Sequence, residues 1–78
     1  DLMLTLSLKL KDNKGVLSAV LSFLYHLGAN VLSINQSVPE NGVAAVTLTV
    51  FTAEMTADIE ALSAGLSEIN GVSAVSIK

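Results

Sequence analysis

The strongest constraint in this chain lies at its beginning, where every even-numbered residue from position 2 to position 10 is leucine. The odd positions between them hold Met3, Thr5, Ser7 and Lys9. Because successive side chains of a β-strand point to opposite faces of its sheet, this pattern predicts a strand with one buried face and one open face. The rest of the chain must therefore provide another layer that covers the buried face of the sheet to which this strand belongs.

The spacing then changes to that of a helix. A polar cluster over residues 11–15 ends in Gly15, and from residue 16 to residue 27 the apolar side chains recur at three and four positions. This periodicity predicts an amphipathic helix over residues 16–27. The opposite, polar side of that helix holds Ser18, Ser22, Tyr25 and His26. Gly28 follows the last periodic residue and suits a left-handed cap, so we expect the helix to end there.

A second strand and a hairpin are expected next. Residues 31–38 alternate between apolar and polar side chains, end at Pro39, and contain no charge, no internal proline and no obvious bulge. The Asn41-Gly42 pair then supplies the positive φ angles that a tight turn between antiparallel strands needs. Residues 43–51 are therefore expected to return as a third strand.

The last third of the chain repeats the order of helix and strand. Its helical periodicity is carried by Ile59, Leu62, Leu66 and Ile69. Thr52 and Thr56 are possible N-terminal caps of this second helix, and the Asn70-Gly71 pair predicts its end. Residues 72–77 alternate once more and predict a fourth strand.

The resulting order, βαββαβ, is that of a split βαβ motif. Right-handed crossovers place both helices on one face of a four-stranded antiparallel sheet with the strand order 4-1-3-2. The sequence therefore predicts an α+β, ferredoxin-like sandwich. Because residue 1 is not methionine and falls inside the alternating pattern, we expect residues 1–78 to form one domain of a longer parent chain.

Composition excludes several classes of function. The chain is 51% hydrophobic and 14% charged, and its apolar runs are short, so neither a disordered chain nor a membrane span is expected. Seven acidic residues against four lysines and no arginine give a net charge of −3, which argues against a nucleic-acid partner. Without cysteine there is no thiol nucleophile and no thiolate metal cluster.

The polar residues that remain do not predict catalysis. His26, the only histidine, lies on the polar side of the first helix, and Glu60 and Glu68 are eight residues apart on the exposed side of the second. RNA-recognition modules of this fold need aromatic residues on strands one and three, where this chain has only Phe51. We therefore expect no enzyme activity, no metal and no cofactor.

The first loop is the best candidate for a ligand site on chemical grounds. Its polar residues run into a helix N-terminus, where backbone N–H groups and the helix dipole favour an anion such as an α-carboxylate. The same residues could equally form an ordinary helix cap, and Asn30 could be a plain turn residue.

Three segments closely resemble an ACT domain, and together they extend the resemblance over essentially the whole chain. They are Leu4–Leu10, Asp12–Leu17 and Leu27–Val31. Residues 32–36, followed by Pro39–Gly42, are most similar to small bacterial ACT-domain proteins labelled chorismate-mutase-like. The resemblance implies a cytoplasmic module that senses an amino acid or another small metabolite and regulates a linked or partner enzyme of amino-acid biosynthesis.

The resemblance also implies a ligand site. The family's Asp-x-Pro-Gly loop corresponds to residues 12–15, with Lys14 where the proline usually stands. Residues implied to contact the ligand are Asp12, Asn13, Gly15, Val16, Leu17, Asn30 and Val31. Backbone N–H groups at residues 15–17 would hold the carboxylate, and Asp12 or Asn13 would hold the ammonium group. Aromatic or branched apolar amino acids are the favoured ligands.

The resemblance and the second strand together predict a homodimer. In the expected sheet this strand is at an edge, and an edge without protective features invites pairing. We expect residues 31–38 and the helix over residues 16–27 to meet their counterparts in a continuous eight-stranded sheet, and a proline at Ser33 to disrupt it. Gly15 and Asn30 are expected at the same end of the first crossover, where a ligand could touch both subunits. The alternative is a purely structural dimerisation module without a ligand.

Overall fold

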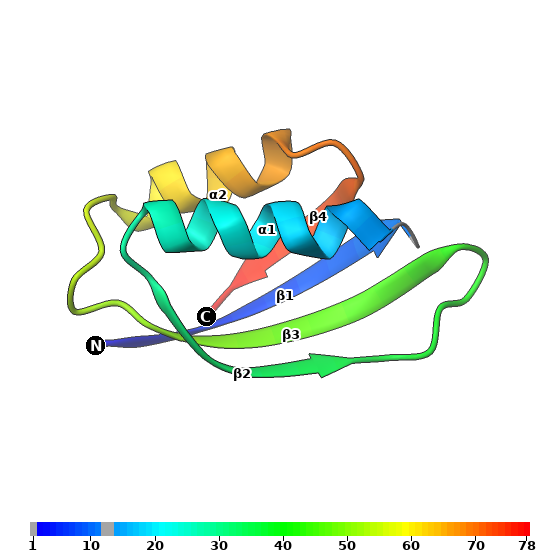
Figure 1. The fold of residues 1–78 in the computed structure, drawn as a ribbon, viewed down its shortest axis with the longest axis horizontal. Helices are drawn as coiled ribbons and strands as arrows, with labels where there is room; N and C mark the ends of the chain where they lie inside the picture. Colours follow the sequence, from blue (N-terminus) through cyan, green and yellow to red (C-terminus); the bar gives the residue numbers. More distant parts are fainter. Residues whose placement is uncertain (1, 12–13) are drawn as a thin grey trace.

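A computed structural model, which describes residues 2–11 and 14–78, has the expected order of elements. The elements are β1 (Met3–Lys11), α1 (Lys14–His26), β2 (Asn30–Gln36), β3 (Val43–Phe51), α2 (Ile59–Glu68) and β4 (Val72–Ile77). The strands form one antiparallel sheet with the order β2-β3-β1-β4, and both helices cover the same face (Figure 1). This arrangement confirms the predicted ferredoxin-like fold.

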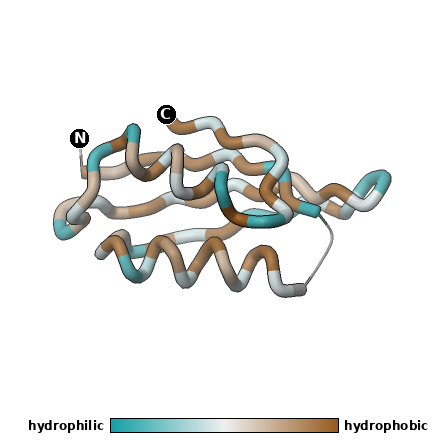
Figure 2. The backbone as a smooth tube through the Cα atoms, turned by 90° about the horizontal axis from the view of Figure 1, so that it is seen from above, coloured by the Kyte–Doolittle hydropathy of each residue, from teal (hydrophilic) through white to brown (hydrophobic). Residues whose placement is uncertain are grey.

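The core lies between the sheet and the helices, where the leucine alternation of β1 predicts it. Leu6, Leu8 and Leu10 are at most 3% exposed, and Leu6 lies directly opposite Leu48 of β3. The helices complete this core with the buried side chains of Val16, Val20, Leu24, Leu62 and Leu66. Figure 2 shows the apolar residues recurring along the helices and strands, with a hydrophilic β2–β3 turn projecting at one end. Neither α1 nor α2 covers the other face of the sheet, which we call the open face.

The edge strand β2 differs from its expected form. It covers residues 30–36 rather than 31–38, and its register against β3 shifts between Val31 and Ser33. Leu32 is thus an extra residue in the ladder, a β-bulge, and the expectation of an unbulged strand was wrong. The bulge shifts the alternation by one residue, so that Val31 and Ile34 lie opposite Val50 and Leu48. The regular pattern of residues 32–36 by itself does not reveal this shift.

The N-terminal cap of α2 also differs from the expectation. Asp58, not Thr52 or Thr56, caps the helix, and its carboxylate accepts a hydrogen bond from the N–H of Ala61 at 2.8 Å. Thr56 instead donates from its backbone N–H and its hydroxyl to the carbonyl of Leu27, at 2.8 and 3.3 Å. The threonine therefore ties the loop before α2 to the end of α1.

The turn after α1 has the glycine cap that the sequence predicts. Gly28 has a φ of +84°, and the N–H groups of Gly28 and Ala29 donate to the carbonyls of Tyr25 and Leu24, both at 3.0 Å. This pair of bonds is a Schellman motif, which satisfies the last carbonyls of the helix and directs the chain into β2. Within the described residues, no helix is both long enough and apolar enough to cross a membrane.

Candidate functional site

The first group of candidate residues forms the beginning of α1. Gly15, Val16 and Leu17 lie in its first turn, while Asp12 and Asn13 fall outside the described residues. The Val16 side chain is only 6% exposed and packs in the core, so this residue could offer a ligand only its backbone. Leu17 is half-buried and could contact a ligand through its side chain.

The second group, Asn30 and Val31, begins β2 and lies at the other end of α1 (Figure 1). The 13 residues of α1 span about 20 Å at roughly 1.5 Å per residue. Gly15 and Asn30 are therefore far apart within one subunit, and the expectation that they share one end of the crossover was wrong. The reason is that the chain enters α1 at Lys14 and leaves it, toward β2, only after His26.

A hollow of about 470 Å³ lies between α1 and the free edge of the sheet. Its lining residues are Leu21, Tyr25, Ala29, Asn30, Val31, Leu32, Ser33 and Ile34. The structure thus places the candidates Asn30 and Val31 in one hollow, which is also lined by apolar side chains of α1. Tyr25 belongs to this group but reads in the sequence as an ordinary surface residue, because helical periodicity places it on the polar side.

The apolar side chains beside the free edge are exposed. Tyr25 is 79% exposed, Leu32 51% and Ile34 45%. Isolated exposed apolar residues are common on protein surfaces, but here three of them line one hollow beside the free edge of β2. The group forms a continuous apolar margin along β2 and α1.

The backbone of β2 presents hydrogen-bonding groups to this margin. The N–H of Ser37 donates to the carbonyl of Ala45 at 2.9 Å, and hydrogen-bonded pairs alternate along an antiparallel ladder. The register then directs the backbone groups of Ser33 and Asn35 toward β3, and those of Ile34 and Gln36 toward the free edge. A proline at Ser33 would therefore break the β2–β3 ladder rather than the free edge, which makes it an unsuitable probe of edge pairing.

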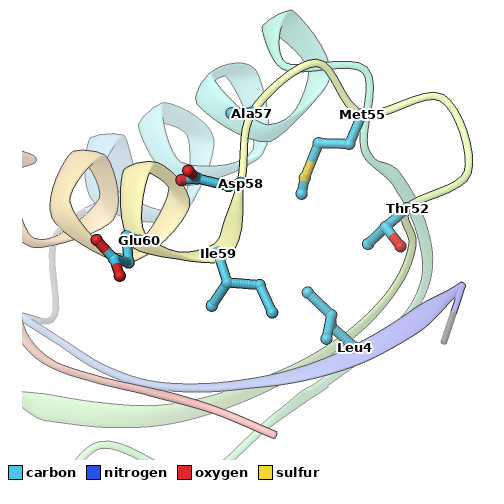
Figure 3. A pocket seen from close by; sticks show the side chains of 7 residues that line it. All are labelled: Leu4, Thr52, Met55, Ala57, Asp58, Ile59 and Glu60. Carbon is cyan, nitrogen blue, oxygen red and sulfur yellow. The ribbon is translucent and has the colours of Figure 1, made fainter.

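A second hollow, of about 510 Å³, lies under the first turn of α2 (Figure 3). Leu4, Met55 and Ile59 point toward one another in its interior, and the carboxylate of Asp58 turns toward the helix that it caps. An apolar group could enter this hollow, but none of the candidate ligand contacts that the structure describes lines it.

The residues weighed for catalysis are separate from both hollows except for Glu60, which lines the second. His26 contacts Tyr25 edge to face, with ring centroids 6.0 Å apart, on the exposed side of α1. Glu68 is exposed on α2. In the described part of the chain, His, Asp and Glu side chains nowhere gather in a group of three or more that could hold a metal ion.

Comparisons with known sequences connect this geometry to a family. The model of the ACT domain matches residues 4–70. A UPF0735 ACT domain-containing protein of Carboxydothermus hydrogenoformans is 45% identical over 75 residues, which are 96% of this chain and 51% of that protein. Another, from Clostridium botulinum, is 43% identical over 68 residues, which are 87% of this chain and 47% of that protein. The chain spans about half the length of the curated relatives it matches.

Solved structures agree on the fold. The ACT domain from GTP pyrophosphokinase of Chlorobium tepidum superposes with a TM-score of 0.76 at 18% identity, over 100% of this chain and 99% of that one. The ligand-free regulatory subunit of aspartate kinase from Thermus thermophilus superposes with a TM-score of 0.72 at 28% identity, over 100% of this chain and 52% of that one. With the family model matching most of its length, this chain belongs to the ACT domain family, a type of regulatory ligand-binding domain.

Proposed function

We propose that this chain is a regulatory module that binds an amino acid and acts as a homodimer joined through β2 and α1. The observation that carries the proposal is the free edge of β2, where the outward backbone groups of Ile34 and Gln36 adjoin the exposed side chains of Tyr25 and Leu32. Edge pairing would satisfy those backbone groups and remove this apolar margin from water. A second copy supplies the same complementary surface by two-fold symmetry.

The dimer would also bring the two groups of candidate residues together. When two copies of β2 pair antiparallel, the start of one strand lies near the end of the other. The end of β2 lies at the same end of the sheet as Lys11, just before α1 begins, because Gln36 pairs with Val46 and Lys11 with Val43. Asn30 of the partner subunit would therefore approach the first turn of α1. In this arrangement each ligand site needs both subunits.

The chemistry of the two groups favours an amino acid. The first turn of α1 offers backbone N–H groups at the positive end of the helix dipole to the α-carboxylate. Asn30 of the partner subunit would accept a hydrogen bond from the ammonium group through its side-chain oxygen. Leu17 and Val31, both half-buried, would contact the side chain, which favours an aromatic or branched apolar residue. Binding across the interface would change the stability of the dimer and so regulate a linked or partner enzyme.

A thermal-shift screen of the twenty amino acids tests ligand binding. A ligand that binds only the folded dimer, at about 100 times its Kd, adds roughly 2.7 kcal/mol of stability, so the melting temperature should rise. Asn30→Ala should reduce that rise. Asn35→Ala is the matched control, because this amide is also exposed on β2 but lies farther along the strand. A flat response to all twenty would contradict the proposal and favour a structural dimerisation module.

The proposal also assigns catalysis to other polypeptides or domains. The described residues offer no paired nucleophile and base and no metal-ion cluster, so the chain should not turn over small metabolites by itself. Conversion of chorismate to prephenate, followed spectrophotometrically, provides a direct check. A rate well above that of the uncatalysed reaction would contradict the assignment.

A further inference from the structure

The lysines of this chain are concentrated on one face, although its net charge is −3. Lys9 and Lys11 occupy odd positions of β1, whose even positions face the helices, so both lysines lie on the open face of the sheet. Lys78 joins them, because its backbone exchanges two hydrogen bonds of 3.0 Å with Thr5 and paired residues share a face. Three of the four lysines thus lie along β1 and the end of β4.

Four of the five acidic side chains in the described part of the chain lie elsewhere. Most of the described ones belong to α2 and the loop before it, on the other side of the sheet: Glu54, Asp58, Glu60 and Glu68. Glu40 pairs with Val43, which in turn pairs with Lys11, so this carboxylate lies on the open face at the end of the sheet, two strands away from Lys11. Within the described residues, no ion pair neutralises the three lysines. Among the described residues, the surface around Lys9 is therefore basic, and its one acidic neighbour on this face, Glu40, forms no ion pair with Lys11.

Small side chains make a shallow hollow in the same surface. It encloses about 200 Å³ where β1, β3 and β4 run side by side. The side chains that face it are those of Ser7, Lys9, Ala45, Thr47, Ala74 and Ser76. This volume could take one large apolar side chain, and the hydroxyl groups around it could form hydrogen bonds. The open face therefore combines three lysines with a shallow hollow that lies beside Lys9.

We propose that the open face, defined by Lys9, Lys11, Lys78 and the hollow at Ala45 and Ala74, docks an acidic amphipathic helix of a partner protein. Charge complementarity carries the inference. The Cβ atoms of residues i and i+4 of a helix are about 6 Å apart. Lys9 and Lys11 are separated by a similar distance, about 6.7 Å, along β1. One apolar side chain of that helix would fill the hollow.

A nucleic acid fits this surface less well. Single-stranded nucleic acids use aromatic side chains for stacking as well as positive charge, and β1 and β3 together offer only Phe51, at the end of β3 away from Lys9 and Lys11. The overall negative charge would also repel a long polyanion, whereas a short acidic helix needs only the local group of lysines.

The test is an NMR titration of the 15N-labelled protein with a synthetic amphipathic helix that carries glutamates at i, i+4 and i+7 beside leucines. Amide shifts should concentrate at Ser7, Thr47 and Ser76. Lys9→Glu combined with Lys11→Glu should weaken binding by about tenfold or more. Lys14→Glu is the matched control, because it removes the remaining lysine, at the start of α1, and should leave the affinity nearly unchanged.

A second variant tests the hollow without altering charge. Ala74→Leu, at an exposed position of β4, should fill the hollow and weaken peptide binding while the melting temperature stays near that of the wild type. An oligothymidylate probe should bind more weakly than the peptide. The proposal is overturned if the peptide does not bind, if neither variant lowers its affinity, or if the oligothymidylate binds the same lysines more tightly.

Discussion

Gly28 is the residue at which backbone conformation and packing act together. Its φ of +84° suits the end of α1, and a Cβ atom there would overlap the backbone carbonyl of Glu54. A side chain at this position would therefore meet two separate penalties, backbone strain and a collision with main-chain atoms that cannot rotate away. The sequence predicts the backbone strain, because the glycine follows a helical pattern. The collision cannot be predicted in this way, because it involves the loop that contains Glu54, which is distant in the sequence.

Gly28→Ala is expected to lower the free energy of unfolding by about 2 to 4 kcal/mol, from the left-handed strain and the overlap together. Gly42→Ala is the matched control, because Gly42 has a similar φ of +76° but a Cβ atom there would meet nothing within 4 Å in the described part of the chain. The control should lose only about 1 to 2 kcal/mol. Urea denaturation measures both. Equal losses of unfolding free energy in the two variants would show that the overlap with Glu54 does not contribute to the effect of Gly28→Ala.

At the scale of elements, the strands that alternate most regularly could be predicted best. β1 and β3 each bury one face, so the period of two in their sequences corresponds directly to their structure. The bulge at Leu32 and the choice of cap for α2 could not be predicted in the same way. The cap depends on a contact that is distant in the sequence: Thr56 could cap a helix, but its N–H and hydroxyl donate to the carbonyl of Leu27 instead.

The cap of α2 gives a prediction at this scale. Asp58→Ala removes the acceptor for the N–H of Ala61 and should destabilise the protein by about 1 kcal/mol. Asp58→Asn should retain most of the stability, since asparagine is a comparably good cap. Thr52→Ala provides a further control and should have little effect on α2. A loss for Asn as large as that for Ala would contradict the capping role, and thermal or urea unfolding distinguishes the two results.

At the scale of the whole molecule, the candidate site could be predicted only in parts. The sequence indicates the first turn of α1 and the start of β2 as separate chemical groups, but the length of α1 separates them. Whether they form one site depends on a second copy, and the periodicity of a single chain contains no information about the geometry of two. The hollow beside Tyr25 was likewise not predictable, because it depends on how α1 lies over the edge strand.

Sedimentation velocity on the wild type and Gln36→Pro at high micromolar concentration tests the central claim, a dimer paired through the free edge of β2. Proline removes the outward N–H of Gln36, so the variant should sediment as a monomer with a near-wild-type fold, while the wild type sediments as a dimer. Asn35→Pro is the control, because it removes an N–H that faces β3 and should destabilise the sheet itself. A monomeric wild type, or a Gln36→Pro protein that remains dimeric, would contradict the account.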